Sequence, residues 1–176
     1  MNISANANMD AGVDLEQMIN AHGQAILRYC HLLLRDYHEA QDVVQTTFIK
    51  AFYSKAAAKY TLDNLSPLLY KIAYNQCMDI LRKRKRLFGF LEREKREVKE
   101  FYQMDEGISE EVNAALGTLD PDDRALVISR IINGFEYEEL SQIYGLPSPT
   151  LRKRYERAKK RLADALREQG FGGAYG

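Results

Sequence analysis

Residues 135–166 read FEYEELSQIYGLPSPTLRKRYERAKKRLADAL, a pattern that predicts a helix, a tight turn and a second, strongly basic helix. Gly145 can adopt the left-handed backbone conformation that ends the first helix. Ser148 suits the N-cap of the second helix and Pro149 its first turn. In the second helix one apolar stripe recurs at helical spacing, formed by Leu151, Tyr155, Ala158, Leu162 and Ala165.

The charge of the second helix lies outside this stripe. The charged positions are mostly cationic: Arg152, Lys153, Glu156, Arg157, Lys160 and Arg161. A helix-turn-helix places its second helix in the DNA major groove, with N-terminal residues at base edges and basic residues near phosphates. The alternative is an ordinary helical hairpin with a solvated charged face. The turn residues and the one-sided basic charge together favour DNA binding.

The composition is that of a globular protein whose charges gather in patches. The chain has 176 residues, of which 45% are hydrophobic, and its formal net charge is zero. Two basic stretches, residues 82–86 and 152–161, are separated by an acidic stretch over residues 105–123. This distribution predicts two separate nucleic-acid contacts, whereas the zero net charge argues against a nonspecific polycation.

Helical periodicity dominates the chain, and the fold class that it predicts is all-α, with two small helical bundles joined by a charged linker. The first bundle is expected over residues 10–86, with helices in 14–35, 38–57 and 66–86. The linker is expected over residues 87–108 and the second bundle, which contains the helix-turn-helix, over 109–168. In the helix expected over residues 38–57 we assign Val43, Phe48, Ile49 and Tyr53 to the apolar pattern. The Gly-rich residues 169–176 are predicted to be a disordered tail.

No constellation in the chain supports catalysis. His22, His31 and His38 have no metal-binding spacing, and there is neither a Gly-rich phosphate loop nor a nucleophile elbow. We therefore predict no enzyme activity, no metal and no cofactor. Cys30 and Cys77 fall inside helical patterns, which favours buried thiols. Since no stretch approaches the ~20 apolar residues of a membrane span, we expect a cytoplasmic protein without membrane insertion.

Residues 82–86 are five consecutive cations, RKRKR, at the end of a predicted helix. They could be a solvated helix end, a flexible polybasic tail or a phosphate contact, and their mutual repulsion favours an anionic partner. The preceding turns carry Tyr70, Lys71, Tyr74 and Asn75 at helical spacing. Aromatic side chains beside cations are typical of single-strand binding surfaces. Tyr70 and Tyr74 are equally compatible with the edge of a core, so both interpretations stay open.

Three segments together resemble the bacterial sigma-70 family, most closely its small extracytoplasmic-function (ECF) sigma factors. Residues 39–52 are similar to the family's Ala-x-Asp-Leu-Val-Gln-Glu-Thr-Phe helix, and residues 68–82 to its Trp-Leu-x-x-Ile-Ala-x-Asn-x-x-x-Asp-x-x-Arg segment. Residues 119–162 are similar to its Leu-Pro-x-x-x-Arg, Gly-x-Ser-Tyr-x-Glu-Ile-Ala and Pro-x-Gly-Thr-Val-Lys-Ser-Arg series. The order and spacing of the three make the combination specific. The family's Glu after Gln is Thr46 here, and its usual Ser is Lys153.

The resemblance implies a role for each matching segment. The first would bind the clamp helices of the β′ subunit of RNA polymerase core through Asp42, Val43, Gln45, Phe48 and Lys50. The loop at 59–64, with Lys59, Tyr60 and Asn64, would capture a flipped base of the minus-ten promoter element. The helix after it would contact that element and its backbone through Lys71, Tyr74, Asn75, Arg82 and Lys83. The minus-thirty-five element would be recognised from the major groove by Thr150, Arg152, Lys153, Glu156, Arg157 and Lys160.

The function implied is therefore that of an alternative sigma factor, which directs polymerase to specific promoters and assists DNA opening. Its partners would be RNA polymerase core, including the β flap, promoter DNA and an anti-sigma factor. Two other interpretations remain from the residues alone. A self-sufficient dimeric helix-turn-helix regulator would bind palindromic DNA with half-sites about one helical turn apart. A helical adaptor would show no DNA dependence.

Overall fold

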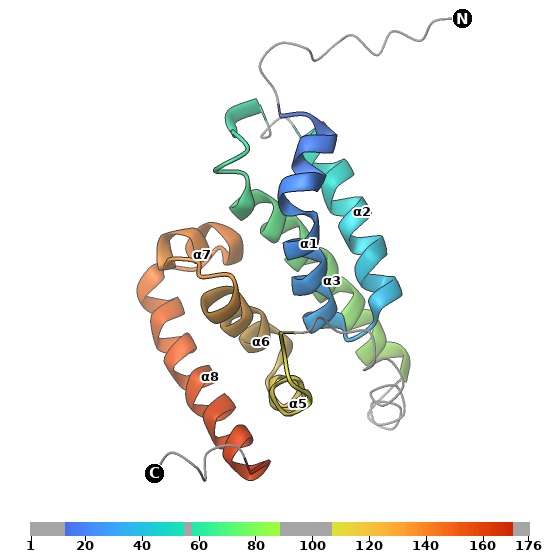
Figure 1. The fold of residues 1–176 in the computed structure, drawn as a ribbon. Helices are drawn as coiled ribbons and strands as arrows, with labels where there is room; N and C mark the ends of the chain where they lie inside the picture. Colours follow the sequence, from blue (N-terminus) through green and yellow to red (C-terminus); the bar gives the residue numbers. More distant parts are fainter. Residues whose placement is uncertain (1–12, 55–57, 89–106, 171–176) are drawn as a thin grey trace, which may run out of the picture.

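The computed structural model describes residues 13–54, 58–88 and 107–170, and all regular structure in these ranges is helical. Figure 1 shows two groups of helices lying against each other: α1, α2 and α3 form the first bundle, and α5 to α8 form the second. The predicted all-α, two-bundle fold class is confirmed. Residues 10–12 of the predicted first bundle, most of the predicted linker and residues 171–176 of the predicted tail lie outside the described residues.

The first bundle consists of α1 (Leu15–Leu34), α2 (Tyr37–Tyr53) and α3 (Ser66–Phe88). The backbone of Arg35 is left-handed, with φ 58°, which reverses the chain between α1 and α2 in two residues. Asp36 then caps α2 because its carboxylate accepts the Glu39 backbone N–H at 2.9 Å. Ser66 is the first helical residue of α3, and the helix continues past the predicted end at 86, so the basic run is helical throughout.

The second bundle consists of α5 (Glu110–Gly117), α6 (Pro121–Val127), α7 (Tyr137–Tyr144) and α8 (Ser148–Glu168). A π-helical segment, Ile128–Ile132, continues α6. Gly145 has φ 69°, as the turn requires. The predicted N-cap at Ser148 is wrong by one residue. Pro147 occupies that position, and the Ser148 hydroxyl instead donates to the Tyr137 carbonyl at 3.3 Å, which ties α8 to α7.

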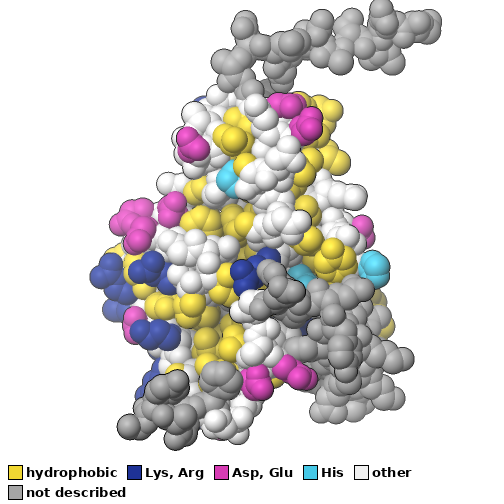
Figure 2. Space-filling model, viewed as in Figure 1, with side chains coloured by type: hydrophobic (Ala, Val, Ile, Leu, Met, Phe, Trp, Pro, Cys, Tyr) yellow, Lys and Arg dark blue, Asp and Glu magenta, His cyan; other side chains and the backbone are white. Residues whose placement is uncertain are grey.

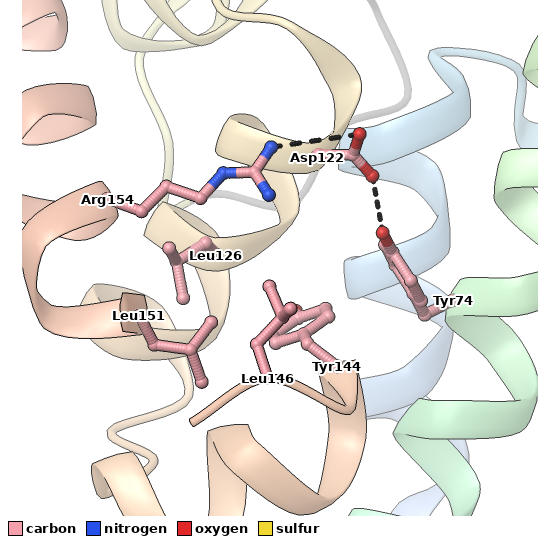
Figure 3. Close-up of a pocket in the computed structure, with 7 residues that line it drawn as sticks. All are labelled: Tyr74, Asp122, Leu126, Tyr144, Leu146, Leu151 and Arg154. Carbon is pink, nitrogen blue, oxygen red and sulfur yellow. Dashed lines mark hydrogen bonds and ion pairs between the residues drawn. The ribbon is translucent and has the colours of Figure 1, made fainter. Parts of the chain in front are cut away.

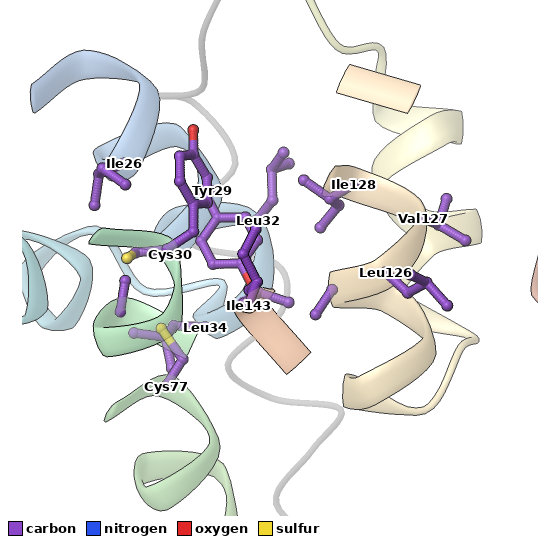
Figure 4. Close-up of a cluster of buried hydrophobic side chains, with 14 of the residues drawn as sticks. Ile26, Tyr29, Cys30, Leu32, Leu34, Cys77, Leu126, Val127, Ile128 and Ile143 are labelled. Carbon is purple, nitrogen blue, oxygen red and sulfur yellow. The ribbon is translucent and has the colours of Figure 1, made fainter. Parts of the chain in front are cut away.

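One continuous apolar core joins the two bundles. Figure 4 shows Tyr29 and Leu32 of α1 on the side of Ile128, the first residue of the π-helical segment, and Cys30 on the other side, toward Cys77. The two cysteines are free and fully buried, as expected from the sequence. A hydrogen bond between the Cys30 and Cys77 thiols, together with burial, raises the pKa of Cys30. The contact of α3 with α7 and of α1 with α6 places the two bundles against each other along one seam.

Candidate nucleic-acid and partner interfaces

The N-terminal half of α8 presents an open, charged surface. Lys and Arg side chains gather along this helix at the left of Figure 2, with a few carboxylates beside them. The opposite side of α8 is apolar, and its Leu151, Ala158 and Leu162 are buried. All the side chains predicted to contact the minus-thirty-five element are exposed: Thr150, Arg152, Lys153, Glu156, Arg157 and Lys160.

Two arginines on another face of α8 fasten the helix to α6. Asp123 is 8% exposed and receives Arg154 Nε at 2.7 Å and Arg161 Nη1 at 3.3 Å. Hydrogen bonds between a carboxylate and guanidinium groups are charge-assisted and shorter than neutral ones. Both arginines are therefore paired within the bundle, although Arg161 is 61% exposed whereas Arg154 is half-buried.

The exposed Arg152 is positioned by an aromatic ring. Its guanidinium carbon lies 4.9 Å from the ring centroid of Tyr137, and that of Arg130 lies 5.0 Å from the same centroid. Arg130 is anchored by a 3.0 Å hydrogen bond from Nη1 to the Phe135 carbonyl. The ring thus lies near two cations, Arg130, which is bonded to the bundle, and Arg152, on the exposed surface of α8.

The surface of α3 is divided between exposed and covered residues. Lys71, Asn75, Arg82 and Lys83 are exposed, which a contact with the minus-ten element would require. Tyr74 is half-buried. Its hydroxyl donates to Asp122, and its ring packs edge-on against Tyr144 with the centroids 4.7 Å apart. This position differs from the solvent-facing one that the stacking interpretation required.

The basic run at the end of α3 is partly used inside the first bundle. Arg84 pairs with the Glu39 carboxylate and donates from Nη1 to the Leu34 carbonyl at 2.8 Å. Arg82 is exposed and pairs with Asp79 at 2.9 Å on the same helix. Lys83, Lys85 and Arg86 are exposed. The run therefore offers a helical cationic edge in which Arg84 serves a structural role.

The loop before α3 has its own internal bonds. The Asn64 side chain accepts the Thr61 backbone N–H at 2.7 Å, and His22 Nε2 lies 3.0 Å from the Leu62 carbonyl. Lys59 and Asn64 are exposed, whereas Tyr60 is partly buried against the core. The loop thus presents polar groups to solvent on a shape fixed by Asn64 itself.

On α2 the predicted polymerase-binding residues divide by face. Asp42, Gln45 and Lys50 are exposed, whereas Val43 and Phe48 are 3% and 2% exposed and belong to the core. A direct contact through Val43 or Phe48 is therefore corrected, because their side chains already pack inside the bundle. The assignment of Ile49 and Tyr53 to the apolar pattern is corrected as well, since they are 52% and 79% exposed. Ile49 follows Gln45 by four residues and Asp42 by seven, and Tyr53 follows Ile49 by four; this helical spacing is the signal that identifies the outer face.

A small pocket lies where α3, α6 and α8 meet. Figure 3 shows Asp122 between Tyr74 of α3 and Arg154 of α8, above Leu126, Leu146, Leu151 and Tyr144. Asp122 Oδ2 lies 3.7 Å from Arg154 Nη2. The polar groups that line the pocket are the Asp122 carboxylate and its two partners, Tyr74 and Arg154. Their contacts connect α6 to α3 and to α8. No group of residues suited to a metal ion occurs in the described part of the chain, and no helix there is long and apolar enough to cross a membrane.

Comparison with known families identifies both bundles. Residues 18–87 match the family profile of Sigma-70 region 2, and residues 109–162 match that of Sigma-70, region 4. The ECF RNA polymerase sigma factor SigE of Mycolicibacterium smegmatis is 27% identical over 159 residues, which cover 86% of this chain and 61% of SigE. The ECF sigma factor SigW of Bacillus subtilis is 24% identical over 176 residues, covering 92% of this chain and 91% of SigW.

Solved structures share the fold. The sigma factor RpoE of Bartonella quintana, in complex with the anti-sigma factor NepR, superposes with a TM-score of 0.66 and 25% identity, covering 88% of this chain and 97% of that one. CnrH, in complex with the cytosolic domain of CnrY, superposes with a TM-score of 0.64 and 23% identity, covering 88% of each chain. With regions 2 and 4 matched in order and ECF sigma factors among its relatives, the chain belongs to the ECF group of the sigma-70 family.

Proposed function

We propose that this protein is an alternative sigma factor, which binds RNA polymerase core, directs it to a subset of promoters and assists DNA opening. The observation that carries this proposal is that each matched sigma region presents an exposed helix of suitable chemistry on a separate bundle. The protein acts by recognition and supplies no reacting group of its own. Because polymerase and promoters occupy the cytoplasm of bacteria, that is where we place it.

Recognition of the minus-thirty-five element is assigned to α8. Thr150, Arg152 and Lys153 lie in its first turns, where a recognition helix meets base edges. Arg can hold guanine O6 and N7 through two bonds, and Glu156 can accept from cytosine N4. Arg157 and Lys160 lie farther along the helix, where phosphate contacts are expected.

Recognition of the minus-ten element is assigned to α3 and the loop before it. Lys71, Asn75, Arg82 and Lys83 form an exposed polar and cationic face, and Lys59 and Asn64 project from the loop. Flipping a base out of the duplex costs a few kcal/mol, which a protein pocket can offset by stacking and hydrogen bonds. Tyr60 and Tyr74 are the aromatic side chains that we assign to this stacking.

Polymerase binding is assigned to the outer face of α2. Asp42, Gln45 and Lys50 supply polar contacts with the β′ clamp helices, and Ile49 and Tyr53 supply exposed apolar area beside them. An aromatic anchor next to charged groups is a common composition for an interaction hot spot. The second bundle would contact the β flap, and an anti-sigma factor would compete for these faces.

Run-off transcription tests the proposal. Purified polymerase core is incubated with fragmented DNA from the source organism, with and without the protein. We expect new start sites that depend on the protein and that share two upstream elements. An Asp42→Ala, Gln45→Ala double variant should reduce these transcripts, whereas Asp164→Ala on the C-terminal half of α8 should leave them unchanged. Absence of protein-dependent starts, together with tight binding of the free protein to a palindrome, would support a dimeric regulator instead.

A further inference from the structure

Three tyrosines of the first bundle meet the second bundle along one seam. Tyr29 lies on α1, and Tyr70 and Tyr74 lie one turn apart on α3. We call these three residues the tyrosine face. Each of them contacts a residue of the second bundle through its ring, its hydroxyl or both. The seam therefore differs from a purely aliphatic core, because it contains polar groups that need partners.

Tyr70 lies at the centre of the face. Its ring packs edge-on against Tyr29 of its own bundle and against Phe135 of the second, with centroid distances of 5.0 and 4.8 Å. Its hydroxyl accepts the Asn133 side-chain N–H at 2.9 Å. Burial raises the pKa of Tyr70, which keeps the hydroxyl neutral. The second bundle thus supplies both an aromatic neighbour and a hydrogen-bond partner.

Tyr29 is bonded through Tyr144 of α7. The Tyr144 hydroxyl donates its single hydrogen to the Ala125 carbonyl at 3.0 Å. The Tyr29 hydroxyl, 3.1 Å away, and the Ser129 hydroxyl, 2.6 Å away, must therefore act as donors to Tyr144. Since Ala125 and Ser129 belong to the second bundle, Tyr144 stays bonded there even when Tyr29 departs.

Tyr74 is held by a carboxylate that has a second partner. Asp122 accepts the Tyr74 hydroxyl and also lies 3.7 Å from Arg154 of α8. Figure 3 shows the carboxylate between the two. Separation of the bundles would free Tyr74 and leave Asp122 paired with Arg154. The Asp122 carboxylate therefore has a charged partner whether or not the bundles are docked.

Arg124 of α6 also has partners in both bundles. Its buried guanidinium donates to carbonyls of Leu116, Gly117 and Leu119 inside the second bundle. One further N–H reaches across the seam to the Leu33 carbonyl at 3.0 Å, near the C-terminal end of α1, where the helix dipole is negative. Docking thus adds one bond to an arginine that its own bundle already positions.

From these contacts we propose that the tyrosine face is the docking site of the second bundle in the free protein, and that single-stranded promoter DNA competes with the second bundle for it. The proposal rests on the proposed function only in its second half. Domain interfaces that are rich in polar contacts behave like transient interfaces, and relative motion is the expectation for them. Each donor or acceptor that the second bundle offers here keeps another partner or reaches solvent on release.

Competition follows from what covers Tyr74. The Tyr144 ring occupies part of the surface of the Tyr74 ring on which a base could stack, and the Asp122 carboxylate beside it repels phosphate. Lys71 and Asn75, on the same helix, are exposed in the docked state. The docked protein therefore offers cations for the DNA backbone and withholds the aromatic ring.

Small-angle X-ray scattering of the free, full-length protein tests the docking. The variant is Asp122→Ala, Asn133→Ala, which removes two polar contacts of the second bundle and alters no residue assigned to DNA. The control is Asp164→Ala, which removes an exposed carboxylate that pairs with Arg167 and so matches the charge change. A compact chain of this length has a radius of gyration of about 16 Å. We expect the variant to exceed the wild type by a few Å, on the order of 3 Å, and the control to match the wild type.

Fluorescence anisotropy with a pool of random 20-nucleotide DNA single strands tests the competition. The apparent affinity is reduced by the fraction of protein that is competent to bind, so we expect the variant to bind the pool about threefold tighter or more. The control should bind as the wild type does. Circular dichroism establishes that the variant keeps its helices.

The outcomes distinguish the docking of the second bundle from the competition by single-stranded DNA. Expansion with tighter binding supports the proposal. A variant that stays as compact as the wild type overturns the docking. Expansion without tighter binding overturns the competition and the assignment of Tyr74 to DNA, while protein-dependent transcription remains a separate result from the run-off assay.

Discussion

The two helices assigned to DNA, α3 and α8, are presented in opposite ways. Every predicted contact residue of α8 is exposed, from Thr150 to Lys160. On α3 the cationic and amide residues are exposed, whereas Tyr74 is covered by Asp122 and Tyr144. The comparison teaches that one chain can leave exposed the surface that we assign to duplex DNA while it covers part of the surface that we assign to separated strands.

The chemistry of the two surfaces explains the difference. Charged groups such as Arg152 and Arg157 are costly to remove from water, so α8 has no inexpensive internal cover. A tyrosine has an apolar ring and one polar group, and it can be buried when its hydroxyl finds a partner. Tyr70 and Tyr74 find theirs in Asn133 and Asp122. Aromatic residues suited to stacking on bases are thus also suited to reversible packing.

The largest expected effect comes from removing the Arg124 guanidinium, which bonds α6 to the end of α5 and to α1. Arg124→Ala removes the donor of the buried carbonyls of Leu33 and Leu119, whereas the Leu116 carbonyl still accepts the Leu119 backbone N–H. Because each unsatisfied buried acceptor costs about 1–3 kcal/mol, we expect the free energy of unfolding to fall by about 3 kcal/mol or more. Urea unfolding followed by circular dichroism measures it.

The matched control is Arg130→Ala, since Arg130 is more exposed and donates to one carbonyl, that of Phe135. The free energy of unfolding of this variant should fall by about 1 kcal/mol. Equal losses for the two variants would show that the bonds of Arg124 across and within the bundle contribute nothing beyond an ordinary arginine.

Alkaline pH should lower the free energy of unfolding, because the buried tyrosines at the seam between the two bundles lose their protons. Desolvation of its hydroxyl raises the pKa of Tyr144 to about 12, and burial raises that of Tyr29 as well. In the unfolded chain tyrosine titrates near pH 10, so the stabilisation is complete below about pH 10 and is lost as the pH rises toward 12. For Tyr144 this amounts to about 2–3 kcal/mol.

Urea unfolding at intervals between pH 9 and 12 measures the slope. The comparison is with Tyr144→Phe, which lacks the titrating hydroxyl but retains the surface lysines. The wild type should lose stability more steeply than this variant over that range. Parallel slopes would mean that the Tyr144 hydroxyl titrates in the same way in both the folded and the unfolded protein.

The sequence predicted the helices well and their faces less well. The helix Tyr137–Tyr144 ends at Gly145 as predicted because Gly145 adopts the left-handed backbone, whereas Ser148–Glu168 begins one residue earlier than an N-cap at Ser148 implies. On α2 the apolar pattern was too wide to separate the buried Phe48 from the exposed Ile49, since adjacent residues differ by only 100° around a helix. The pairing of Tyr74 with Asp122 joins residues 48 positions apart, and no local pattern predicts such a contact.

The substitution Arg152→Ala tests the exposed surface of α8. If Arg152 holds a guanine, its loss should reduce discrimination at one position of the minus-thirty-five element by about 10-fold or more, since a bidentate contact contributes about 1–3 kcal/mol. Transcription from promoters altered one base pair at a time measures it. Arg167→Ala is the control, because Arg167 is an exposed cation of the same helix that pairs with Asp164, a residue not assigned to DNA. A uniform loss across all base pairs would assign Arg152 to phosphate.

The smallest expected effect concerns Tyr137, which lies between Arg152 and Arg130. A ring that attracts Arg152 reduces the freedom of its guanidinium before DNA arrives, and an exposed cation–π contact contributes about 0.5–1 kcal/mol. Tyr137→Leu should therefore reduce discrimination at the Arg152 position by about 2- to 5-fold, while Tyr137→Phe, which keeps the ring, should retain it. Discrimination at the minus-ten element is the internal reference, because a general loss of folding would lower both. If Leu and Phe behave alike, the ring does not position Arg152, and the open surface of α8 acts through its charges alone.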